Sequence, residues 1–390
     1  MSVMDYESAG VDYDVLDAAK RSALEAASRT ITRSSFYKHA YGAPLPQSHG
    51  EPAFVFRANG ASTLATVLEC LGTKSVIARQ YADAGGPNLF HHVGFDAVAA
   101  IVNDLACVGA LPLVINAYFA TGSPDWYRDR ARYASLLAGW EDGCSAAGAV
   151  WGGGESPSLS GLVNEQDIEI AGSAVGFIPP DQEAILGQDL GPGDEIVFIS
   201  STGIHTNGAS LVRAIAERLP KGYRTLLPNG RELGEAVLDR SALYVELVAE
   251  LGRCHDVRVT YYSHTTGHGL RKLMRADKEL TYRIETLPLP VPAILSEIRR
   301  YAGMDDRTAY GTLNMGVGFA VFCAAGHAGR VVDIARNQGL RAALAGRVED
   351  GAKRVILEPL GVTFEEDQLQ LRHVSAVSRR AKARSRASSR

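Results

Sequence analysis

Four short polar clusters in this sequence combine residue types that can bind anions or metal ions. The first is Gly72-Thr73-Lys74, which follows an apolar segment and has Glu69 just before it. Backbone N–H groups, a hydroxyl and an ammonium in succession can surround a phosphate. The GxxxxGK[ST] spacing of a P-loop is absent, so a simple turn is the favoured interpretation of this cluster taken alone.

The second cluster lies on a helix that apolar periodicity predicts over residues 95–109. Asp96 and Asn103 are seven residues apart, which places them about 20° apart around the helix axis, with Asp104 about a quarter-turn away. Carboxylates and an amide in this arrangement suit Mg²⁺, which prefers oxygen ligands and bridges nucleotide phosphates. An N-cap at Asp96 followed by a polar helix edge is an equally good interpretation.

The third cluster follows the apolar segment Ala149-Val150-Trp151. It is Gly152-Gly153-Gly154-Glu155-Ser156, in which three glycines allow another group to approach the backbone closely and an acid comes next. A loop that holds a metal ion or a phosphate fits this pattern, and a tight turn fits it equally well.

Two similar junctions in the second half form the fourth cluster. Residues 200–208 lead from a predicted strand through Ser201, His205 and Asn207 into a predicted helix, and residues 264–269 repeat this layout with His264 and Thr266. Helix N-termini that carry hydroxyl and glycine residues bind anions through their free N–H groups. Capping explains either junction alone, but the two together favour an anion site.

Composition excludes several classes of protein. The chain has 390 residues, 40 Lys and Arg against 44 Asp and Glu, and a formal charge of −4, so no global basic field indicates nucleic acid as a partner. No apolar run reaches the length of a membrane span, and no secretory leader is recognisable at the N-terminus. The five cysteines are scattered and never form a CxxC pair. This pattern predicts a globular protein of a reducing cytoplasm, without a disulfide framework or a structural zinc site.

The elements that must position these clusters alternate between short apolar strands and amphipathic helices in both halves, which predicts a mixed α/β or α+β fold in two domains. A cluster of Pro, Gly and Asp at residues 178–195 marks the expected boundary. We expect an N-terminal tether and helix over 1–50, one domain over 51–180, a second over 181–372, and a basic, disordered tail over 373–390.

Taken in order, the clusters resemble phosphoribosylformylglycinamidine cyclo-ligase, also called aminoimidazole ribonucleotide synthetase, and its ATP-binding superfamily. The resemblance runs from about residue 6 to about residue 320. The matching stretches are Ala9 to Asp14, Gly72-Thr73-Lys74, Asp96 to Asp104, Gly109 to Leu113, Gly153-Gly154-Glu155, Ile170-Ala171-Gly172, Ser200 to Arg213, His264 to Gly267 and Asn314 to Gly318.

The resemblance implies an α+β, two-domain fold in which the N-terminal domains of a homodimer form a shared β-barrel that carries the nucleotide site. It also implies ATP and Mg²⁺ as cofactors, a nucleotide-linked small molecule as substrate, and neither membrane nor nucleic acid as partner. The family phosphorylates the formyl oxygen of formylglycinamidine ribonucleotide and then closes the imidazole ring. Phosphorylation is needed because an amide oxygen is a poor leaving group. For phosphoryl transfer, a protein mainly has to position the reactants and neutralise their charge.

By the same resemblance, residue roles carry over to positions of this chain. Lys74 would contact phosphate and act in catalysis with His205 and His264. The Mg²⁺ ligands would be Glu69, Asp104 and Glu155. The nucleotide would be bound by Gly72, Thr73, Lys74, Asp96, Asn103, Gly153, Gly154 and Ser156. The substrate would contact Ser201, Asn207 and Thr266.

Several positions depart from the family pattern. Glu69 stands where the family has Asp, residues 37–43 replace a Gly-rich loop, and residues 156–161 lack a second acid. His268 occupies the position of a family glycine. Because these changes gather at nucleotide and substrate contacts, two alternatives stay open: a divergent enzyme that uses ATP to activate an oxygen of another substrate, and a silent nucleotide-binding subunit.

Overall fold

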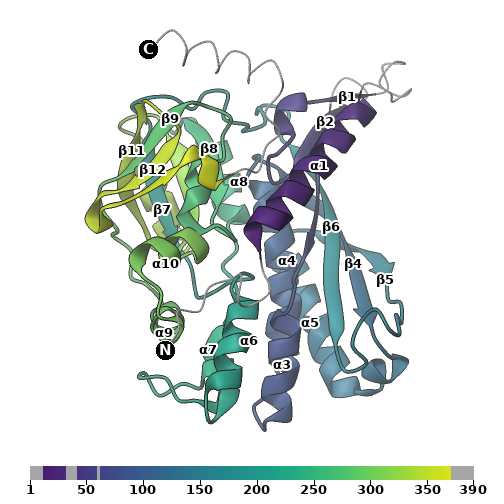
Figure 1. Cartoon of the computed structure of the whole chain (residues 1–390). Helices are drawn as coiled ribbons and strands as arrows, with labels where there is room; N and C mark the ends of the chain where they lie inside the picture. The colour runs from purple at the N-terminus through teal and green to yellow at the C-terminus, as the bar shows by residue number, and fades with distance from the viewer. Residues whose placement is uncertain (1–11, 32–41, 59–61, 370–390) are drawn as a thin grey trace.

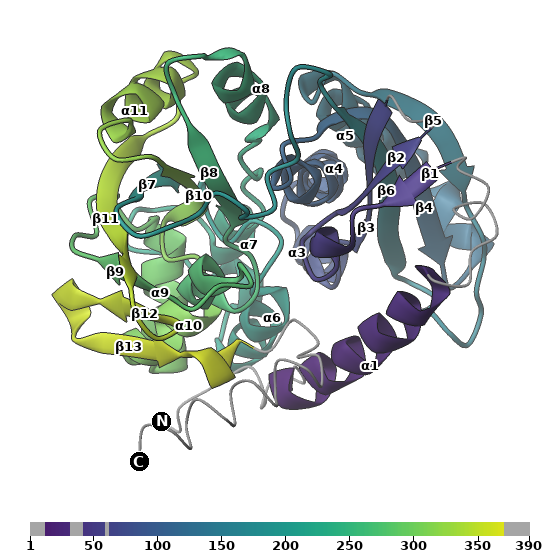
Figure 2. The same ribbon diagram turned by 90° about the horizontal axis from the view of Figure 1, so that it is seen from above.

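Two β-sheets lie on either side of a central group of helices (Figures 1 and 2). The computed structural model describes residues 12–31, 42–58 and 62–369. Helix α1 (Tyr13–Ile31) lies away from both sheets, across the open side between the two halves (Figure 2). The fold is mixed α+β, as the alternation of elements predicts.

The first sheet has six strands in the order β1-β2-β3-β6-β4-β5. All neighbours are antiparallel except β4 and β5. Its strands are β1 (Gly42–Pro44), β2 (Phe54–Ala58), β3 (Ser62–Cys70), β4 (Leu111–Thr121), β5 (Val150–Glu155) and β6 (Ile168–Ile178). Its helices are α3 (Lys74–Asp83), α4 (Phe90–Ala106), α5 (Arg130–Ala146) and the 3₁₀ turns η1 (Pro46–Ser48) and η2 (Pro124–Arg128).

Alternation along the strands decides which face of this sheet is covered. In β6 every second residue from Ile168 to Ile178 is buried, and this face packs against α4. The opposite face carries Leu68, Val175 and Val150, which are exposed apolar side chains. The described part of the sheet is open, with β1 and β5 at its edges, and it does not close into a barrel within one chain.

The second sheet has seven strands in the order β13-β12-β9-β11-β7-β10-β8, with β12 and β9 parallel. Its strands are β7 (Glu195–Ser200), β8 (Val259–His264), β9 (Leu280–Ile284), β10 (Val317–Cys323), β11 (Ala342–Asp350), β12 (Arg354–Leu357) and β13 (Val362–Glu365). Its helices are α6 (Ala209–Arg218), α7 (Leu233–Val237), α8 (Val245–Arg253), α9 (Ala293–Ala302), α10 (Asp306–Thr312), α11 (Ala328–Asn337), η3 (Gly222–Arg224), η4 (Gly269–Met274), η5 (Glu358–Leu360) and η6 (Glu366–Gln368).

The sequence pattern also predicts helices over residues 126–148, 238–253 and 267–275, and all three differ in the structure. The helix expected over 126–148 begins at Arg130, because the side chain of Asp129 caps it by accepting from Arg132 N. The helix expected over 238–253 forms only from Val245, since residues 241–244 bond to α4 instead. The segment 267–275 forms the 3₁₀ turn η4 rather than an α-helix.

The predicted boundary segment, residues 178–195, lies between the last strand of the first sheet and the first strand of the second. The predicted basic tail and most of the segment that replaces the Gly-rich loop lie outside the described residues. All five cysteines are free. Among the helices of the described residues, none has the length and apolar character needed to cross a membrane.

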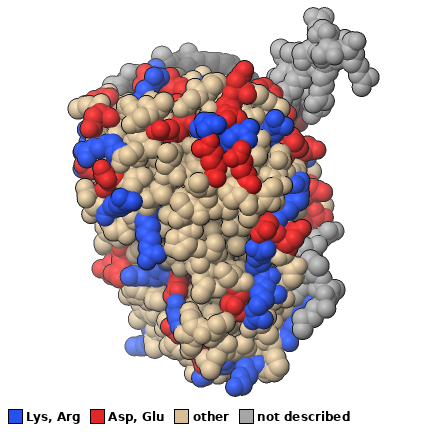
Figure 3. Space-filling view, turned by 90° about the vertical axis from the view of Figure 1, so that its left-hand side faces the viewer, with Lys and Arg blue, Asp and Glu red and all other residues tan. Residues whose placement is uncertain are grey.

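Charges of both signs are mixed on the surface. On the face that Figure 3 presents, described Lys and Arg side chains alternate with Asp and Glu around a broad uncharged centre. This face therefore presents no continuous basic band.

Candidate active site

A cavity of about 500 Å³ opens between the two halves and is lined by residues of both. The first half contributes the end of β3, the turn at residues 71–73 and part of α4. The second half contributes residues 206–210 and the segment that runs from His264 to Arg275. Helix α1 adds a third wall with Tyr13, Lys20 and Leu24.

Two carboxyl groups lie next to each other in this cavity. Glu69 is the next-to-last residue of β3 and Asp104 lies in the last turn of α4, so a strand and a helix packed on it bring the pair together. Burial and the neighbouring Asp104 charge raise the pKa of Glu69 to about 8. Burial alone would raise the pKa of Asp104, but its hydrogen bond to His264 Nδ1, 2.6 Å from Oδ1, and the nearby cations hold that pKa below its usual range.

Two cations, Lys272 and Arg275, complete this end of the cavity, and no motif in the sequence indicates either of them. Burial lowers the pKa of Lys272 to about 8, although the negative charge of Asp104 acts to raise it. Its ammonium donates to Thr266 Oγ1, and Arg275 Nε donates to the carbonyl of Gly50 at 2.9 Å. Their spacing of three residues in a segment predicted to be helical was the signal that could have identified them.

The donor set fits a magnesium ion that is shared with a nucleotide. Mg²⁺ is usually bound by one or two carboxylates, with water and phosphate oxygens completing its shell. Glu69 and Asp104 supply two carboxyl groups at one place in the cavity, and binding of the ion would require Glu69 to lose its proton. In the part of the chain that the structure describes, no group of three or more His, Cys, Asp or Glu side chains is placed to hold an ion. The pair therefore suits an ion held jointly with phosphates.

Two helix N-termini also meet at the cavity. Gly72 and Thr73 line it directly before α3, and Ala209 and Ser210 line it at the start of α6. The hydroxyls of Thr73 and Ser210 are 3.4 Å apart across the two halves. Free N–H groups at helix starts favour anions. The cavity thus brings together several predicted site residues, namely Glu69, Gly72, Thr73, Asp104, Asn207, His264 and Thr266.

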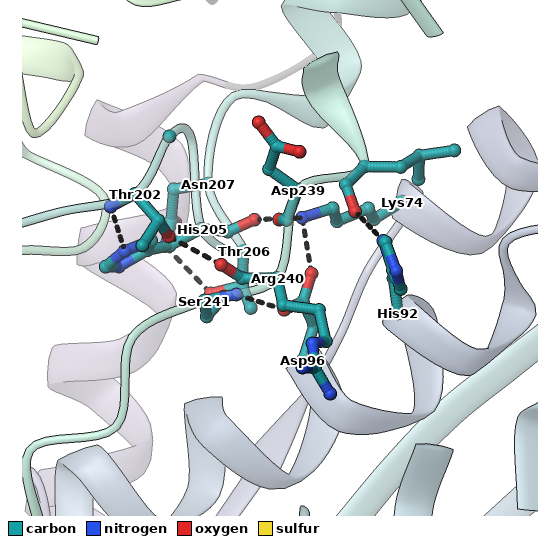
Figure 4. A network of polar contacts seen from close by, with 12 residues as sticks. Lys74, His92, Asp96, Thr202, His205, Thr206, Asn207, Asp239, Arg240 and Ser241 are labelled. Carbon is teal, nitrogen blue, oxygen red and sulfur yellow. Dashed lines mark hydrogen bonds and ion pairs between the residues drawn. The ribbon is translucent and has the colours of Figure 1, made fainter. Parts of the chain in front are cut away.

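Lys74, which is expected to contact phosphate, lies outside the cavity in this structure. Its side chain is 0% exposed and does not line the cavity. The ammonium pairs with the carboxylate of Asp96 and donates to the carbonyls of His205 (2.8 Å) and Asp239 (3.2 Å), as Figure 4 shows. In this structure, Lys74 therefore joins the two halves of the molecule.

Asp96 and Asn103 also bond to the second half rather than lining the cavity. Asp96 Oδ1 accepts from Ser241 N at 2.6 Å. Asn103 donates to the carbonyl of Ala242 at 2.9 Å and accepts from Tyr244 N at 2.9 Å. The two residues do share one face of α4, as their spacing predicts, but their partners are backbone atoms of residues 241–244.

His205 and Ser201, expected at the catalytic and substrate positions, are also buried outside the cavity. The Nε2 atom of His205 accepts from Thr202 N at 3.2 Å and Ala242 N at 3.4 Å (Figure 4). The hydroxyl of Ser201 donates to Asn314 Oδ1 at 2.8 Å. Both side chains therefore hold loops in place in this structure.

The glycine-rich cluster forms neither a loop nor a turn. Residues 150–155 are the edge strand β5, and β6 and β4 lie between it and β3. Glu155, Gly153 and Ser156 are consequently exposed and separated from Glu69 by two strands. A Cβ on Gly154 would lie 2.0 Å from the Ala117 carbonyl oxygen, so the pairing of β5 with β4 accounts for this glycine.

The match to family models identifies the class. Models for the N-terminal and C-terminal domains of AIR synthase related proteins match residues 50–178 and 191–358. The chain belongs to this family.

Curated relatives of this chain include phosphoribosylformylglycinamidine cyclo-ligases. The phosphoribosylformylglycinamidine cyclo-ligase of Methanocaldococcus jannaschii is 34% identical over 281 residues, which cover 72% of this chain and 76% of the relative. The protein of the same name from Methanothermobacter thermautotrophicus is 30% identical over 358 residues, covering 91% and 97%.

Solved structures share the fold at lower sequence identity. The thiamine-monophosphate kinase of Stenotrophomonas maltophilia has a TM-score of 0.55 at 17% identity, covering 80% of this chain and 90% of that one. A hydrogenase maturation protein HypE in complex with ATP has a TM-score of 0.55 at 18% identity, covering 79% and 87%. At these identities the likeness concerns the fold alone.

Proposed function

We propose that this protein is an ATP- and Mg²⁺-dependent cyclo-ligase that converts formylglycinamidine ribonucleotide to aminoimidazole ribonucleotide, a step of purine biosynthesis. The relatives of that name, one of which aligns over 91% of this chain, support the reaction. The observation that carries the proposal is the pairing of Glu69 and Asp104 in a cavity where two helices begin.

The reaction has two steps. The formyl oxygen takes the γ-phosphoryl group of ATP, which leaves ADP. The amidine nitrogen then attacks the formyl carbon, the C–O bond breaks, phosphate departs and a proton is lost from nitrogen. The enzyme must bring the two reactants together and neutralise charge on the phosphates.

The residues of the cavity divide between these tasks. Glu69 and Asp104 would hold Mg²⁺, which when bound neutralises phosphate charge. The N–H groups at the starts of α3 and α6 would bind phosphate oxygens. Lys272 and Arg275 would add positive charge close to the acids. Asn207 and Thr266 would contact the substrate, and His264 would orient Asp104 through their 2.6 Å hydrogen bond.

A homodimer is part of the proposal. The uncovered face of the first sheet exposes Leu68, Val150 and Val175, of which Leu68 is 73% exposed. A second copy packed on this face would bury them and would give the sheet the partner that a shared barrel requires. Such a partner could also bring its own β5 edge, with Glu155, toward a nucleotide.

Turnover with the purified chain tests the proposal. With ATP, Mg²⁺ and formylglycinamidine ribonucleotide, we expect aminoimidazole ribonucleotide and ADP in equal amounts. Asp104→Asn retains a hydrogen-bonding group for His264 but loses a metal ligand, so the rate should fall about 100-fold or more. Asp142→Asn makes the same change on the surface, at a side chain that is 57% exposed, and should leave the rate unchanged.

A second candidate keeps the chemistry and changes the acceptor. His268 stands where the cyclo-ligase pattern has glycine, and it lines the cavity, where a change of side chain can alter which substrate fits. ATP binding without formation of aminoimidazole ribonucleotide would support this candidate. If the wild-type protein fails to bind ATP, both candidates are excluded.

A further inference from the structure

Helix α1 is placed at the cavity but packs poorly against the rest of the molecule. Tyr13, Lys20 and Leu24 line the cavity, and the helix crosses the open side between the two halves (Figure 2). Apolar side chains on other faces of the helix stay in solvent, since Val15 is 63% and Leu16 is 42% exposed. Its position therefore depends on a few specific contacts.

Those contacts converge on His268, next to the cavity loop. The rings of Tyr13 and His268 stack with centroids 4.0 Å apart and planes at 30°. The Tyr13 hydroxyl accepts from His268 N at 3.3 Å, and Asp17 Oδ2 is 3.0 Å from His268 Nε2. The guanidinium of Arg271 lies over the Tyr13 ring at 5.7 Å. We call Tyr13, Asp17 and His268 the clasp.

The backbone of His268 has a conformation that favours glycine, so the contacts of its side chain must offset the strain. Its φ is +73°, in the left-handed region, where a side chain costs about 1 kcal/mol or more and glycine costs nothing. The cyclo-ligase pattern has glycine at this position. The imidazole is nevertheless buried against Tyr13 and Asp17.

The clasp determines where Lys20 lies. Lys20 follows Asp17 by three residues, so the two lie on neighbouring positions of one helix face. Lys272 and Arg275 already donate to protein oxygens. Among the described residues, by contrast, no hydrogen bond or ion pair of the Lys20 ammonium is formed. This exposed ammonium at the edge of the cavity is available to an anion.

We propose that Lys20 binds the ribose 5-phosphate group of the ribonucleotide substrate, and not the phosphoryl group that ATP transfers. His268 is the positioning residue that holds α1, and with it Lys20, at the cavity. The identity of the substrate rests on the proposed function. The presence of an anion contact on α1 does not.

The first experiment separates the charge from the clasp. Lys20→Ala should raise KM for formylglycinamidine ribonucleotide about ten-fold or more, because a charged hydrogen bond is lost, and should leave kcat and the KM for ATP unchanged. Lys20→Arg should restore a low KM. Arg29→Ala removes a positive charge from the same helix, at a side chain that pairs with Glu25 and does not line the cavity, and should have no effect.

The second experiment tests positioning. His268→Gly relieves the backbone strain but removes the clasp. It should raise the same KM and should also speed hydrogen exchange of the α1 amides, whereas Lys20→Ala should raise KM without changing that exchange. An unchanged KM in Lys20→Ala, or α1 protection that is equal in His268→Gly and wild type, would overturn the proposal.

Binding of ribose 5-phosphate, measured by calorimetry on the full chain, separates this inference from the proposed function. Wild-type protein that lacks cyclo-ligase turnover but binds ribose 5-phosphate more tightly than Lys20→Ala does would retain the anion site and reject the assigned substrate. Equal affinity in the two proteins, or no binding by wild type, would reject the anion site.

Discussion

The imidazole of His205 is held neutral by its surroundings. Burial, with the nearby charges of His264 and Lys74, places the pKa of His205 well below its ordinary value. The geometry agrees, because Nε2 accepts two backbone N–H groups and therefore carries no proton. The Nδ1 atom is buried without a hydrogen-bond partner, so a charged ring would gain no compensating contact there.

This environment predicts a dependence of stability on pH. Below about pH 6.5 the unfolded chain takes up a proton at His205 and the folded chain does not, so stability is complete above that pH and declines as the pH falls. At pH 5 this residue alone should lower the free energy of unfolding by about 2 kcal/mol relative to pH 8.

Urea denaturation at both pH values measures this effect. His205→Asn suits the left-handed backbone, where φ is +55°, and removes the titrating group. Its loss of stability between pH 8 and pH 5 should be smaller than that of wild type by about the same 2 kcal/mol. An equal loss in both proteins would contradict the assignment.

At the scale of elements, one face of α4 joins the two halves of the molecule. Asp96 and Asn103 bond to the backbone of residues 241–244, and Lys74 at the start of α3 bonds to both Asp96 and the second half. His92, earlier in α4, lies 2.8 Å from the carbonyl of Leu238 (Figure 4). These polar contacts set the two walls of the cavity relative to each other.

For a buried ion pair of this kind, removing one charge should destabilise the fold more than removing both charges. Lys74→Met leaves the Asp96 carboxylate buried without its cation and should lower the free energy of unfolding by about 3–5 kcal/mol. Combining it with Asp96→Asn removes the stranded charge and keeps an acceptor for Ser241 N, so the double variant should recover much of that loss. Guanidinium denaturation measures both.

A Lys74→Met variant that is as stable as wild type would contradict this prediction. If that variant also lacks ATP turnover, the Lys74 ammonium contacts phosphate during the reaction. The role that the family pattern gives it would then be correct.

At the scale of the whole molecule, the uncovered face of the first sheet is a prediction about assembly. We expect a dimer in sedimentation or light-scattering measurements. Leu68→Lys changes a side chain that is 73% exposed, so the fold should persist while a charge placed in the interface favours the monomer. Leu226→Lys makes the same change at another exposed leucine, 60% accessible and outside this sheet, and should leave the dimer intact. A wild-type monomer would contradict the proposed assembly.

Much of the fold and part of the site could be predicted from local patterns. Helix α4, which the sequence predicts over residues 95–109, is recognisable because its apolar residues repeat at the period of a helix. Periodic patterns depend only on neighbours in the chain, which the sequence contains completely. The resemblance to the cyclo-ligase family, by contrast, implies Glu69 and Asp104 as metal ligands, and the cavity contains both acids.

The tertiary structure alone decided the partners of the other polar residues. Lys74 meets Asp96 and the carbonyl of His205, 131 residues away, and no local pattern encodes that distance. Glu155 lies two strands away from β3 because the strand order is not the chain order. Lys272 in η4 and Arg275 directly after it line the cavity, although the sequence predicts an α-helix there and no chemical role for either residue. A side chain's type follows from the sequence, but its partner is determined by which surfaces the folded chain brings together.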